Sequence, residues 1–294
     1  MKYCVFVDVL GYGSIVTDSN RTESSKLNIL NAIYSNLAAQ MMIDINETNQ
    51  NALDPVYIKS FSDCFYLEST DNIRVLHVVK NIFRNSFTFY GADDYSDLNY
   101  TGLIRGGVTL NWTRRFNDLA GVVTNHQLEN PVGLGVAEAY YLSEKTNLSG
   151  MRIILKPEVF RSLKTTSVTR NNTHYFKHSY SLNGADYFSY YKHITKNEAF
   201  HTVDLYELIW SYDTMNTCTS DGMDVLQKIK PTFSNRVIRH YHKTAQVLLD
   251  GLILTDCKKN IGDHFNKMKV TLTKESQQNT FGKFTYGVRE FLKS

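Results

Sequence analysis

The sequence predicts an α+β fold in which a central, mostly antiparallel sheet is flanked by helices. Short apolar runs typical of buried strands alternate with longer segments whose apolar residues have helical spacing. Over residues 1–155 these segments follow the order β-α-β-β-α-β-α-β. The 294 residues exceed the roughly 100–200 of a typical domain, so we expect one large domain or a catalytic domain with an appendage.

The chain is expected to begin with a strand, a helix and a hairpin. An apolar run predicts a buried strand at residues 3–10, and helical spacing after a glycine-containing turn predicts a helix at about residues 23–45. Strands at residues 56–60 and 64–68 are separated by a turn of one to three residues, so Asp63 should lie at or near the tip of a hairpin. The apolar face of the predicted helix contains Leu27, Leu30, Ile33, Tyr34, Leu37, Ala38 and Met41.

The next segments predict a second helix and further strands. Asp71 is the expected N-cap of a helix that runs to about Phe87. Residues 101–110 predict a strand, in which the paired Gly106 and Gly107 suggest that a backbone or a ligand approaches closely. The less regular stretch up to about Pro131 is expected to form a projecting hairpin. A helix at residues 133–145 and a strand at residues 151–155 should follow.

The first six elements have the β-α-β-β-α-β order of a ferredoxin-like unit. Right-handed crossovers would place the strand that contains Asp8 in the centre of the sheet, beside the hairpin. We expect residues 1–158 to form this catalytic domain and residues 159–294 to form a helical C-terminal extension packed on it. In the extension, tyrosines alternate with polar residues over 175–191, and helices are expected at about residues 203–212, 222–230 and 234–253.

Composition and charge exclude several kinds of partner. The net charge of +3 is small, and the basic residues do not form the runs that mark nucleic-acid-binding arms. No apolar stretch approaches the ~18 residues that a membrane span requires. We therefore expect no nucleic-acid partner, no membrane anchor and a cytoplasmic location.

Two acids indicate the chemistry. Asp8 and Asp63 each lie beside an apolar run, and an aspartate is seldom left in such a run unless it is paired or bound to a metal. The Gly11, Gly13 and Ser14 that follow Asp8 supply the backbone amides that a phosphate needs. These residues together favour metal-dependent phosphoryl or nucleotidyl transfer.

Four blocks of the sequence resemble the class III nucleotidyl cyclases. FVDVLGYGS resembles the acid-containing first strand and its glycine turn, and KSFSDCFYL resembles the Lys-x-x-Gly-Asp hairpin with serine in place of the glycine. LIRGGVTL is similar to the Arg-Gly strand, and GLGVAEAYYLSEK is similar to the helix after the projecting hairpin. The blocks occur in the order of the family and span about residues 3–155.

The details most resemble a subgroup, the Pycsar-type pyrimidine nucleotide cyclases of bacterial anti-phage systems. The shared features are Arg105-Gly106-Gly107 and the helix EAYYLSE. In the purine cyclases this helix carries an Asn and an Arg that stabilise the transition state. Here Ala137 and Tyr141 stand at those positions. This departure counts against an ordinary adenylate or guanylate cyclase.

The resemblance implies a homodimer with active sites at the subunit interface. Each site would convert a nucleoside triphosphate, UTP or less often CTP, to its 3′,5′-cyclic monophosphate and pyrophosphate, and the product would signal to a separate effector protein that aborts phage infection. Two Mg²⁺ or Mn²⁺ ions are implied at each site. Their ligands would be Asp8, Asp63 and the carbonyl of Val9.

The resemblance also implies further site residues. Lys59 and Asn130 would read the base bound by the partner subunit. Arg105 would bind a phosphate or organise Asp8 and Asp63, because its guanidinium can engage two oxygens, and Tyr141 would contact the α-phosphate or stack on the base. The β- and γ-phosphates would be held by the backbone amides of Leu10, Gly11, Tyr12, Gly13 and Ser14.

Three other interpretations stay open. One is an adenylate or guanylate cyclase. A second is a relative of the palm-type polymerases, which also place two acids on adjacent strands for two metals. The third is a catalytically inactive cyclase homologue that binds a nucleotide for regulation.

Overall fold

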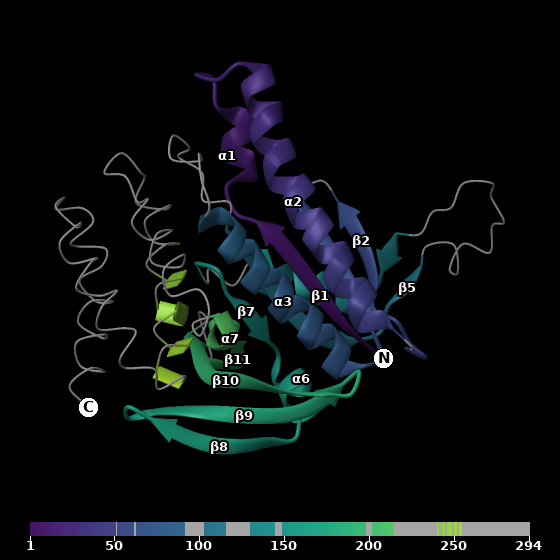
Figure 1. Ribbon diagram of the computed structural model, residues 1–294, viewed down its shortest axis with the longest axis vertical. Helices are drawn as coiled ribbons and strands as arrows, with labels where there is room; N and C mark the ends of the chain where they lie inside the picture. The colour runs from purple at the N-terminus through teal and green to yellow at the C-terminus, as the bar shows by residue number, and fades with distance from the viewer. Residues whose placement is uncertain are drawn as a thin grey trace.

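The computed structural model describes residues 1–50, 52–61, 63–91, 103–115, 130–144, 149–197 and 202–214, and individual positions between 240 and 254. Their strands form a nine-stranded sheet in the order β2-β3-β1-β4-β7-β11-β10-β9-β8 (Figure 1). Only β4 and β7 are parallel among the paired strands described. The strands are β1 (Lys2–Val9), β2 (Tyr57–Phe61), β3 (Cys64–Ser69), β4 (Ile104–Asn111), β7 (Ile153–Leu155), β8 (Thr165–Arg170), β9 (Thr173–Leu182), β10 (Ala185–Asn197) and β11 (Thr202–Leu208).

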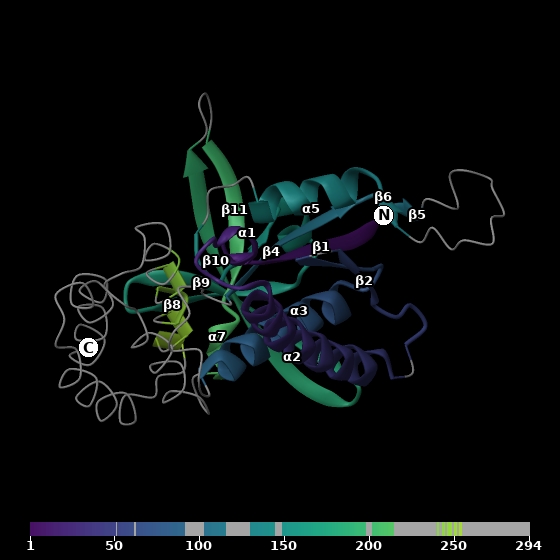
Figure 2. The same cartoon turned by 90° about the horizontal axis from the view of Figure 1, so that it is seen from above.

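Helices cover both faces of the sheet around β1. The long helices α2 (Glu23–Asn49) and α3 (Asn72–Gly91) lie on one face, and α5 (Leu134–Glu144) lies on the other (Figure 2). The main hydrophobic core fills the space between the sheet and α2 and α3, and a smaller cluster joins β1 and β3 to α5. Three short helices complete the described set: α1 (Tyr12–Thr17), α6 (Pro157–Arg161) and α7 (Ser211–Thr214).

The predicted α+β class and ferredoxin-like unit are confirmed. β1 lies in the centre of the unit, between β3 and β4, and both pairings are antiparallel. Asp71 caps α3 as expected, because its side chain accepts hydrogen bonds from the amides of Ile73 at 2.9 Å and Arg74 at 3.1 Å. The predicted projecting hairpin lies mostly outside the described residues, and the segments on either side of it pair as β5 (Arg114–Arg115) and β6 (Pro131–Val132).

The paired glycines of β4 mark the close approach of a helix backbone. A Cβ atom at Gly107 would lie 2.5 Å from the carbonyl oxygen of Ala139 and 2.5 Å from the Cβ of Leu142, both on α5. At Gly106 a Cβ would meet the Phe83 ring of α3 at 3.3 Å. The sequence predicted such an approach, and the structure shows that α5 makes it at Gly107.

The prediction of a helix at residues 203–212 is wrong, because Thr202–Leu208 forms the strand β11. Its apolar residues face both ways: Leu205 packs toward α5 and Leu208 joins the main core. A short segment that is buried on both faces satisfies helical and strand spacing equally, so periodicity alone does not separate them. The predicted apolar face of α2 also needs correction at Leu27, which is 52% exposed, and at Ala38, which is exposed as well.

The first part of the predicted helical extension is also largely β. The alternating tyrosines lie on β9 and β10, which continue the same sheet beyond β11. The predicted helix at 222–230 lies outside the described residues. The described positions between 240 and 254 have helical backbone, as expected for the helix predicted at 234–253.

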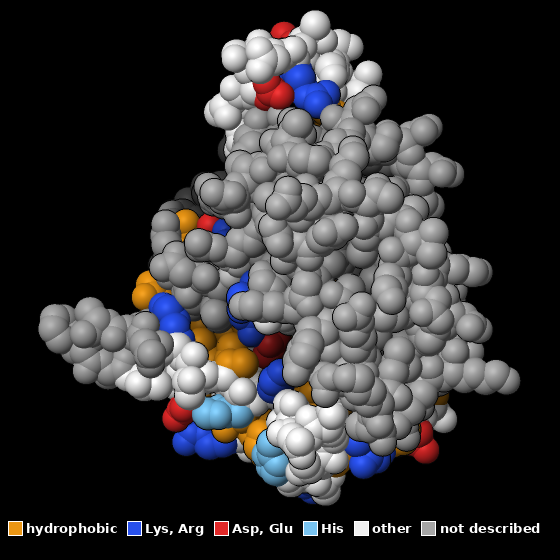
Figure 3. Space-filling model, turned by 90° about the vertical axis from the view of Figure 1, so that its left-hand side faces the viewer, with side chains coloured by type: hydrophobic (Ala, Val, Ile, Leu, Met, Phe, Trp, Pro, Cys, Tyr) orange, Lys and Arg blue, Asp and Glu red, His pale blue; other side chains and the backbone are white. Residues whose placement is uncertain are grey.

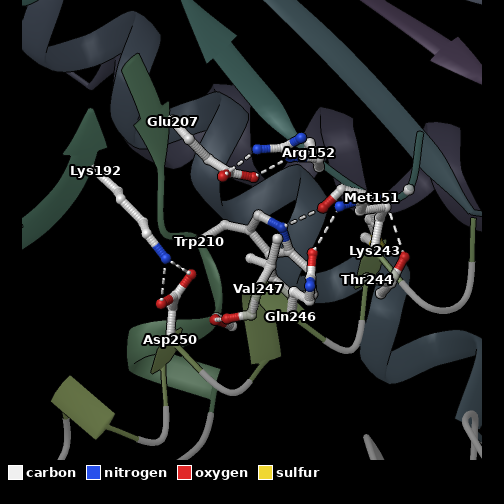
Figure 4. A network of polar contacts seen from close by, with 12 residues as sticks. Met151, Arg152, Lys192, Glu207, Trp210, Lys243, Thr244, Gln246, Val247 and Asp250 are labelled. Carbon is white, nitrogen blue, oxygen red and sulfur yellow. Dashed lines mark hydrogen bonds and ion pairs between the residues drawn. The ribbon is translucent and has the colours of Figure 1, made fainter. Parts of the chain in front are cut away.

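Polar contacts join this C-terminal segment to the sheet (Figure 4). The carboxylate of Asp250 accepts hydrogen bonds from Lys192 of β10 at 2.9 and 3.0 Å, and from the Tyr175 hydroxyl of β9 at 2.6 Å. Nearby, Arg152 makes a two-pronged ion pair with Glu207 of β11, with both contacts at 2.5 Å. These charges are paired and hydrogen-bonded, as buried charges must be. The segment is therefore attached to the outer strands of the sheet.

A substitution at each of the paired glycines tests the close approach of α5. In Gly107→Ala the new methyl group meets helix backbone that cannot rotate away, so we expect a loss of about 3 kcal/mol in the free energy of unfolding. In the control, Gly106→Ala, the methyl group meets a side chain that can shift, and the loss should be about 1 kcal/mol. Urea denaturation measures both. Equal losses would contradict the assignment of the α5 contact to Gly107.

Candidate active site

The two predicted acids lie at the same end of the sheet. Asp8 is near the end of β1, where its partners in the ladder are Cys64 of β3 and Arg105 of β4. Asp63 occupies the hairpin turn directly before Cys64, and its carbonyl accepts a hydrogen bond from the amide of Val9 at 3.1 Å. The β1–β3 pairing therefore brings the two carboxylates together, as the order of elements predicted.

Arg105 connects Asp8 to a third acid. Its Nε donates to Oδ2 of Asp8 at 2.9 Å, and its Nη2 lies 2.5 Å from Oε1 of Glu144, the last residue of α5. All three side chains are largely buried, with 12 to 22% of their surface exposed. The predicted organising contact of Arg105 is thus made with Asp8, and its second partner is Glu144.

Sequence reasoning did not identify Glu144. One signal was available: a carboxylate at the C-terminal end of a helix is unfavourable with the helix dipole, so its presence there indicates another partner. That partner could not be named, because the contact depends on the close approach of α5 to Gly107 on the strand that also carries Arg105.

Negative charge is concentrated around Asp8. Burial raises the pKa of Asp8 well above its usual value, the neighbouring Glu144 and Asp63 raise it further, and Arg105 opposes them. The pKa of the Cys64 thiol is raised to about 12 by burial and by the same three carboxylates. Asp8 and Glu144 both pair with Arg105, and Asp63 adds a third carboxylate, so negative charge exceeds positive charge among the described residues of this site.

A divalent cation fits this set of residues. Carboxylate oxygens are the ligands that Mg²⁺ and Mn²⁺ prefer, and a cation would offset the excess negative charge. In addition, the buried Tyr34 hydroxyl has no hydrogen-bond partner among the described residues. Burial raises the pKa of Tyr34, and Asp63, Tyr12 and Asp8 raise it further. Among the described residues no group of three or more His, Cys, Asp or Glu is arranged to hold a metal ion. Asp8 and Asp63 would therefore need further oxygen ligands, such as the predicted carbonyl of Val9.

The glycine turn after β1 leads into α1. Gly11 has a left-handed backbone, with φ of 93°, which glycine adopts without strain. The first amide bonded inside the helix is that of Ile15, which donates to the carbonyl of Gly11 at 3.1 Å. The amides of residues 11–14 precede it, where a helix offers no acceptor. The amide of Leu10 was predicted to bind a phosphate, but it already donates to the carbonyl of Leu103 at 2.7 Å and would have to break that hydrogen bond first.

The remaining predicted site residues lie farther from Asp8 within one chain. Lys59 is on the edge strand β2, opposite Tyr66 of β3. Asn130 is exposed and directly precedes β6, whose partner β5 follows the end of β4 that is remote from Arg105. Tyr141 is 48% exposed on α5. The resemblance assigned Lys59 and Asn130 to the nucleotide of a partner subunit, and that assignment stays a prediction.

Tyr141 lines a cavity of about 710 Å³ between α5, the start of α6 and the β10–β11 pair. The Lys196 ammonium lies 5.8 Å from the centre of its ring. The cavity also contains Ala137, the other position at which the helix departs from the purine cyclases. Ala137 and Tyr141, the two residues that differ from the purine cyclases, therefore line the same cavity.

A second cavity, of about 490 Å³, lies over the outer strands. Figure 3 shows histidine side chains beside hydrophobic ones on the lower part of this side of the molecule. Two charged or titratable residues that line this second cavity have partners within the chain: His193 contacts Asp204 at 2.9 Å, and Lys192 is bound by Asp250.

No family model and no curated protein matches the sequence. Similar solved structures include a bacterial light-regulated adenylyl cyclase, 10% identical with a TM-score of 0.45 over 76% of this chain, which spans 57% of that structure. A second structure of this kind has a TM-score of 0.42 and 10% identity over 78% of this chain and 97% of its own. A structure of adenylate cyclases from Trypanosoma brucei in their monomeric state has a TM-score of 0.37 and 10% identity, over 70% of this chain and 87% of its own. At such low scores, a functional assignment has to rest on the geometry of the site.

The raised pKa of Asp8 predicts how metal-free stability depends on pH. The folded chain binds the proton of the Asp8 carboxyl more tightly than the unfolded chain does. Protonated Asp8 therefore contributes fully to the free energy of unfolding below about pH 4, the ordinary pKa of Asp. This contribution is lost as the pH rises through the raised pKa of the folded chain. Between pH 4 and 9 in EDTA, Asp8→Asn should gain on the order of 2 kcal/mol in unfolding free energy relative to wild type. The measurement is urea denaturation at each pH.

The control for this series is Glu23→Gln, which changes an exposed carboxylate at the start of α2. Glu23→Gln should show no gain of the size expected for Asp8→Asn. If Asp8→Asn showed no gain over wild type either, the Asp8 carboxylate would not be held in the protonated form by its surroundings.

Proposed function

We propose that this protein is a metal-dependent nucleotidyl cyclase, which converts a nucleoside triphosphate to a 3′,5′-cyclic monophosphate and pyrophosphate. The observation that carries the proposal is the meeting of Asp8 and Asp63 at one end of the sheet, directly before a glycine turn that opens a helix. Acids and phosphate-facing amides at one sheet end are what intramolecular attack on an α-phosphate requires. The proposed location is the cytoplasm, and no described helix is long and apolar enough to cross a membrane.

We assign metal binding, positioning of Asp8 and phosphate binding to different residues at this end of the sheet. Asp8 and Asp63, with the carbonyl of Val9, would hold two Mg²⁺ or Mn²⁺ ions, which when bound lower the pKa of the ribose 3′-hydroxyl and neutralise the phosphates. Arg105 keeps Asp8 in place through the 2.9 Å hydrogen bond. The amides of residues 11–14 would bind the β- and γ-phosphates.

We infer that the protein works as a homodimer. Four large apolar side chains are exposed on or next to α5, which soluble monomers rarely leave as a group. Their exposed fractions are 44% for Leu134, 41% for Tyr140, 48% for Tyr141 and 51% for Trp112. A partner subunit covering this surface would bring its own Asp8 site near residues that lie far from Asp8 in one chain.

The substrate we propose is a pyrimidine nucleotide, UTP in preference to CTP, and the product is proposed to be a second messenger in anti-phage defence. Ala137 and Tyr141 support this choice, because they replace the Asn and Arg of the purine cyclases and both line the same cavity. An adenylate or guanylate cyclase remains the alternative, and ATP or GTP turnover would establish it. An inactive nucleotide-binding homologue is the other alternative.

Turnover assays test the proposal directly. Purified protein with Mn²⁺ and each of the four nucleoside triphosphates should give cyclic UMP and pyrophosphate, with a slower reaction on CTP. Asp63→Ala should lower turnover at least about a thousandfold, since it removes a metal ligand. Asp186→Ala, which changes an exposed acid on β10, is the control and should keep wild-type activity. Linear products alone, or no turnover of any nucleotide, would contradict the cyclase assignment.

A mixing experiment tests the shared site. Asp8→Ala and Lys59→Ala chains should each be inactive alone, but a mixed dimer regains one site in which both residues are intact. Random exchange makes half of the dimers mixed, so activity should return to about a quarter of wild type. No recovery, after subunit exchange has been verified by mass spectrometry, would place the whole site within one subunit.

A further inference from the structure

The hydroxyl of Tyr34 has no partner in the part of the chain that the structure describes. Tyr34 lies on α2, its ring packs against the main core, and its hydroxyl oxygen is buried. A buried phenol usually finds a hydrogen-bond partner, and a buried polar group without one requires an explanation. A ligand that arrives after folding is one such explanation.

Packing holds this hydroxyl in place. The Tyr34 ring meets Tyr12 of α1 edge-on, with centroids 6.2 Å apart and planes at 87°. On another side it lies against Phe65 of β3, with centroids 6.3 Å apart. Tyr12 belongs to the glycine turn and Phe65 follows the hairpin turn, so the same two segments that carry the proposed site fix the ring.

The hydroxyl is within the electrostatic influence of the proposed metal ligands. Burial raises the pKa of Tyr34, and the charge of Asp63 raises it next, followed by Tyr12 and Asp8. The phenol is therefore protonated at neutral pH and can donate its proton. In the structure it donates to neither carboxylate.

We propose that the Tyr34 hydroxyl donates a hydrogen bond to an oxygen atom bound to the divalent cation held by Asp8 and Asp63. The oxygen belongs either to a water molecule on the cation or to the triphosphate, and either one can accept this hydrogen bond. Tyr34 is thus a positioning residue for the metal or the substrate. This inference rests on the proposed function, because it requires a cation between the two aspartates.

The isosteric variant Tyr34→Phe removes only the hydroxyl. Titration calorimetry should compare it with wild type for Mn²⁺ alone and for Mn²⁺ with inorganic tripolyphosphate. We expect about tenfold weaker binding, as for the loss of a hydrogen bond to a charged group. Weakening with Mn²⁺ alone assigns the acceptor to a water ligand, and weakening only with tripolyphosphate assigns it to a phosphate oxygen.

Thermal unfolding in EDTA provides the second measurement. Without a ligand the Tyr34 hydroxyl is an unpaired buried group, so Tyr34→Phe should melt at or above the wild-type temperature. The control is Tyr191→Phe, which removes another buried hydroxyl. Tyr191 lies on β10, and β4, β7 and β11 separate that strand from β1. Tyr191→Phe should keep the wild-type affinity for both ligands.

The outcomes separate the two proposals. If wild type binds Mn²⁺ or Mn²⁺ with tripolyphosphate and Tyr34→Phe binds both equally well, the inference about Tyr34 is overturned and the cyclase proposal stands. If wild type binds neither, both are overturned. If Tyr34→Phe fails to fold or melts well below wild type in EDTA, the hydroxyl has a partner within the protein, and the inference about Tyr34 is overturned.

Discussion

Helix α5 can lie against β4 only because residue 107 has no side chain. The distance of 2.5 Å from a hypothetical Cβ to the backbone of α5 leaves no room for even a methyl group. This contact sets the depth at which the helix packs, and with it the position of Glu144 at the helix end. Since Arg105 lies two residues before Gly107 on the same strand, the approach also brings Glu144 to Arg105. The ion pairs around Asp8 therefore depend on a steric condition in the sheet.

The same packing concentrates charge. Burial raises the pKa of Asp8, Glu144 and Asp63 raise it further, and the guanidinium of Arg105 pairs with both Asp8 and Glu144. A protein stabilised only by its own contacts gains little from such a cluster, because buried like charges oppose folding. A bound cation would offset this charge. The Tyr34 hydroxyl agrees with that interpretation, because it is buried without a partner among the described residues and its ring packs against Tyr12 and Phe65.

The outer strands give the sheet a width that the ferredoxin-like unit alone would not have. β11 pairs with β7, and β10, β9 and β8 follow, so residues 165–208 extend the sheet that carries Asp8. Tyrosines on β9 and β10 then fill the core beneath α3 and α6, and Asp250 fastens the C-terminal segment to Lys192. The predicted boundary at residue 158 falls within α6, between β7 and the outer strands.

Local sequence determined much of this protein. Apolar runs, the Asp71 cap and the turn at Asp63 were sufficient to predict the order of elements and the central place of β1, because periodicity and turn chemistry act over a few residues. The glycine pair predicted a close approach without saying what approaches. Only the tertiary structure decided that α5 makes the contact, that Glu144 meets Arg105, that Thr202–Leu208 is a strand and that the Tyr34 ring packs against Tyr12 and Phe65. These features depend on pairings between residues far apart in the chain, and such pairings are fixed by packing and shape, which local patterns do not encode.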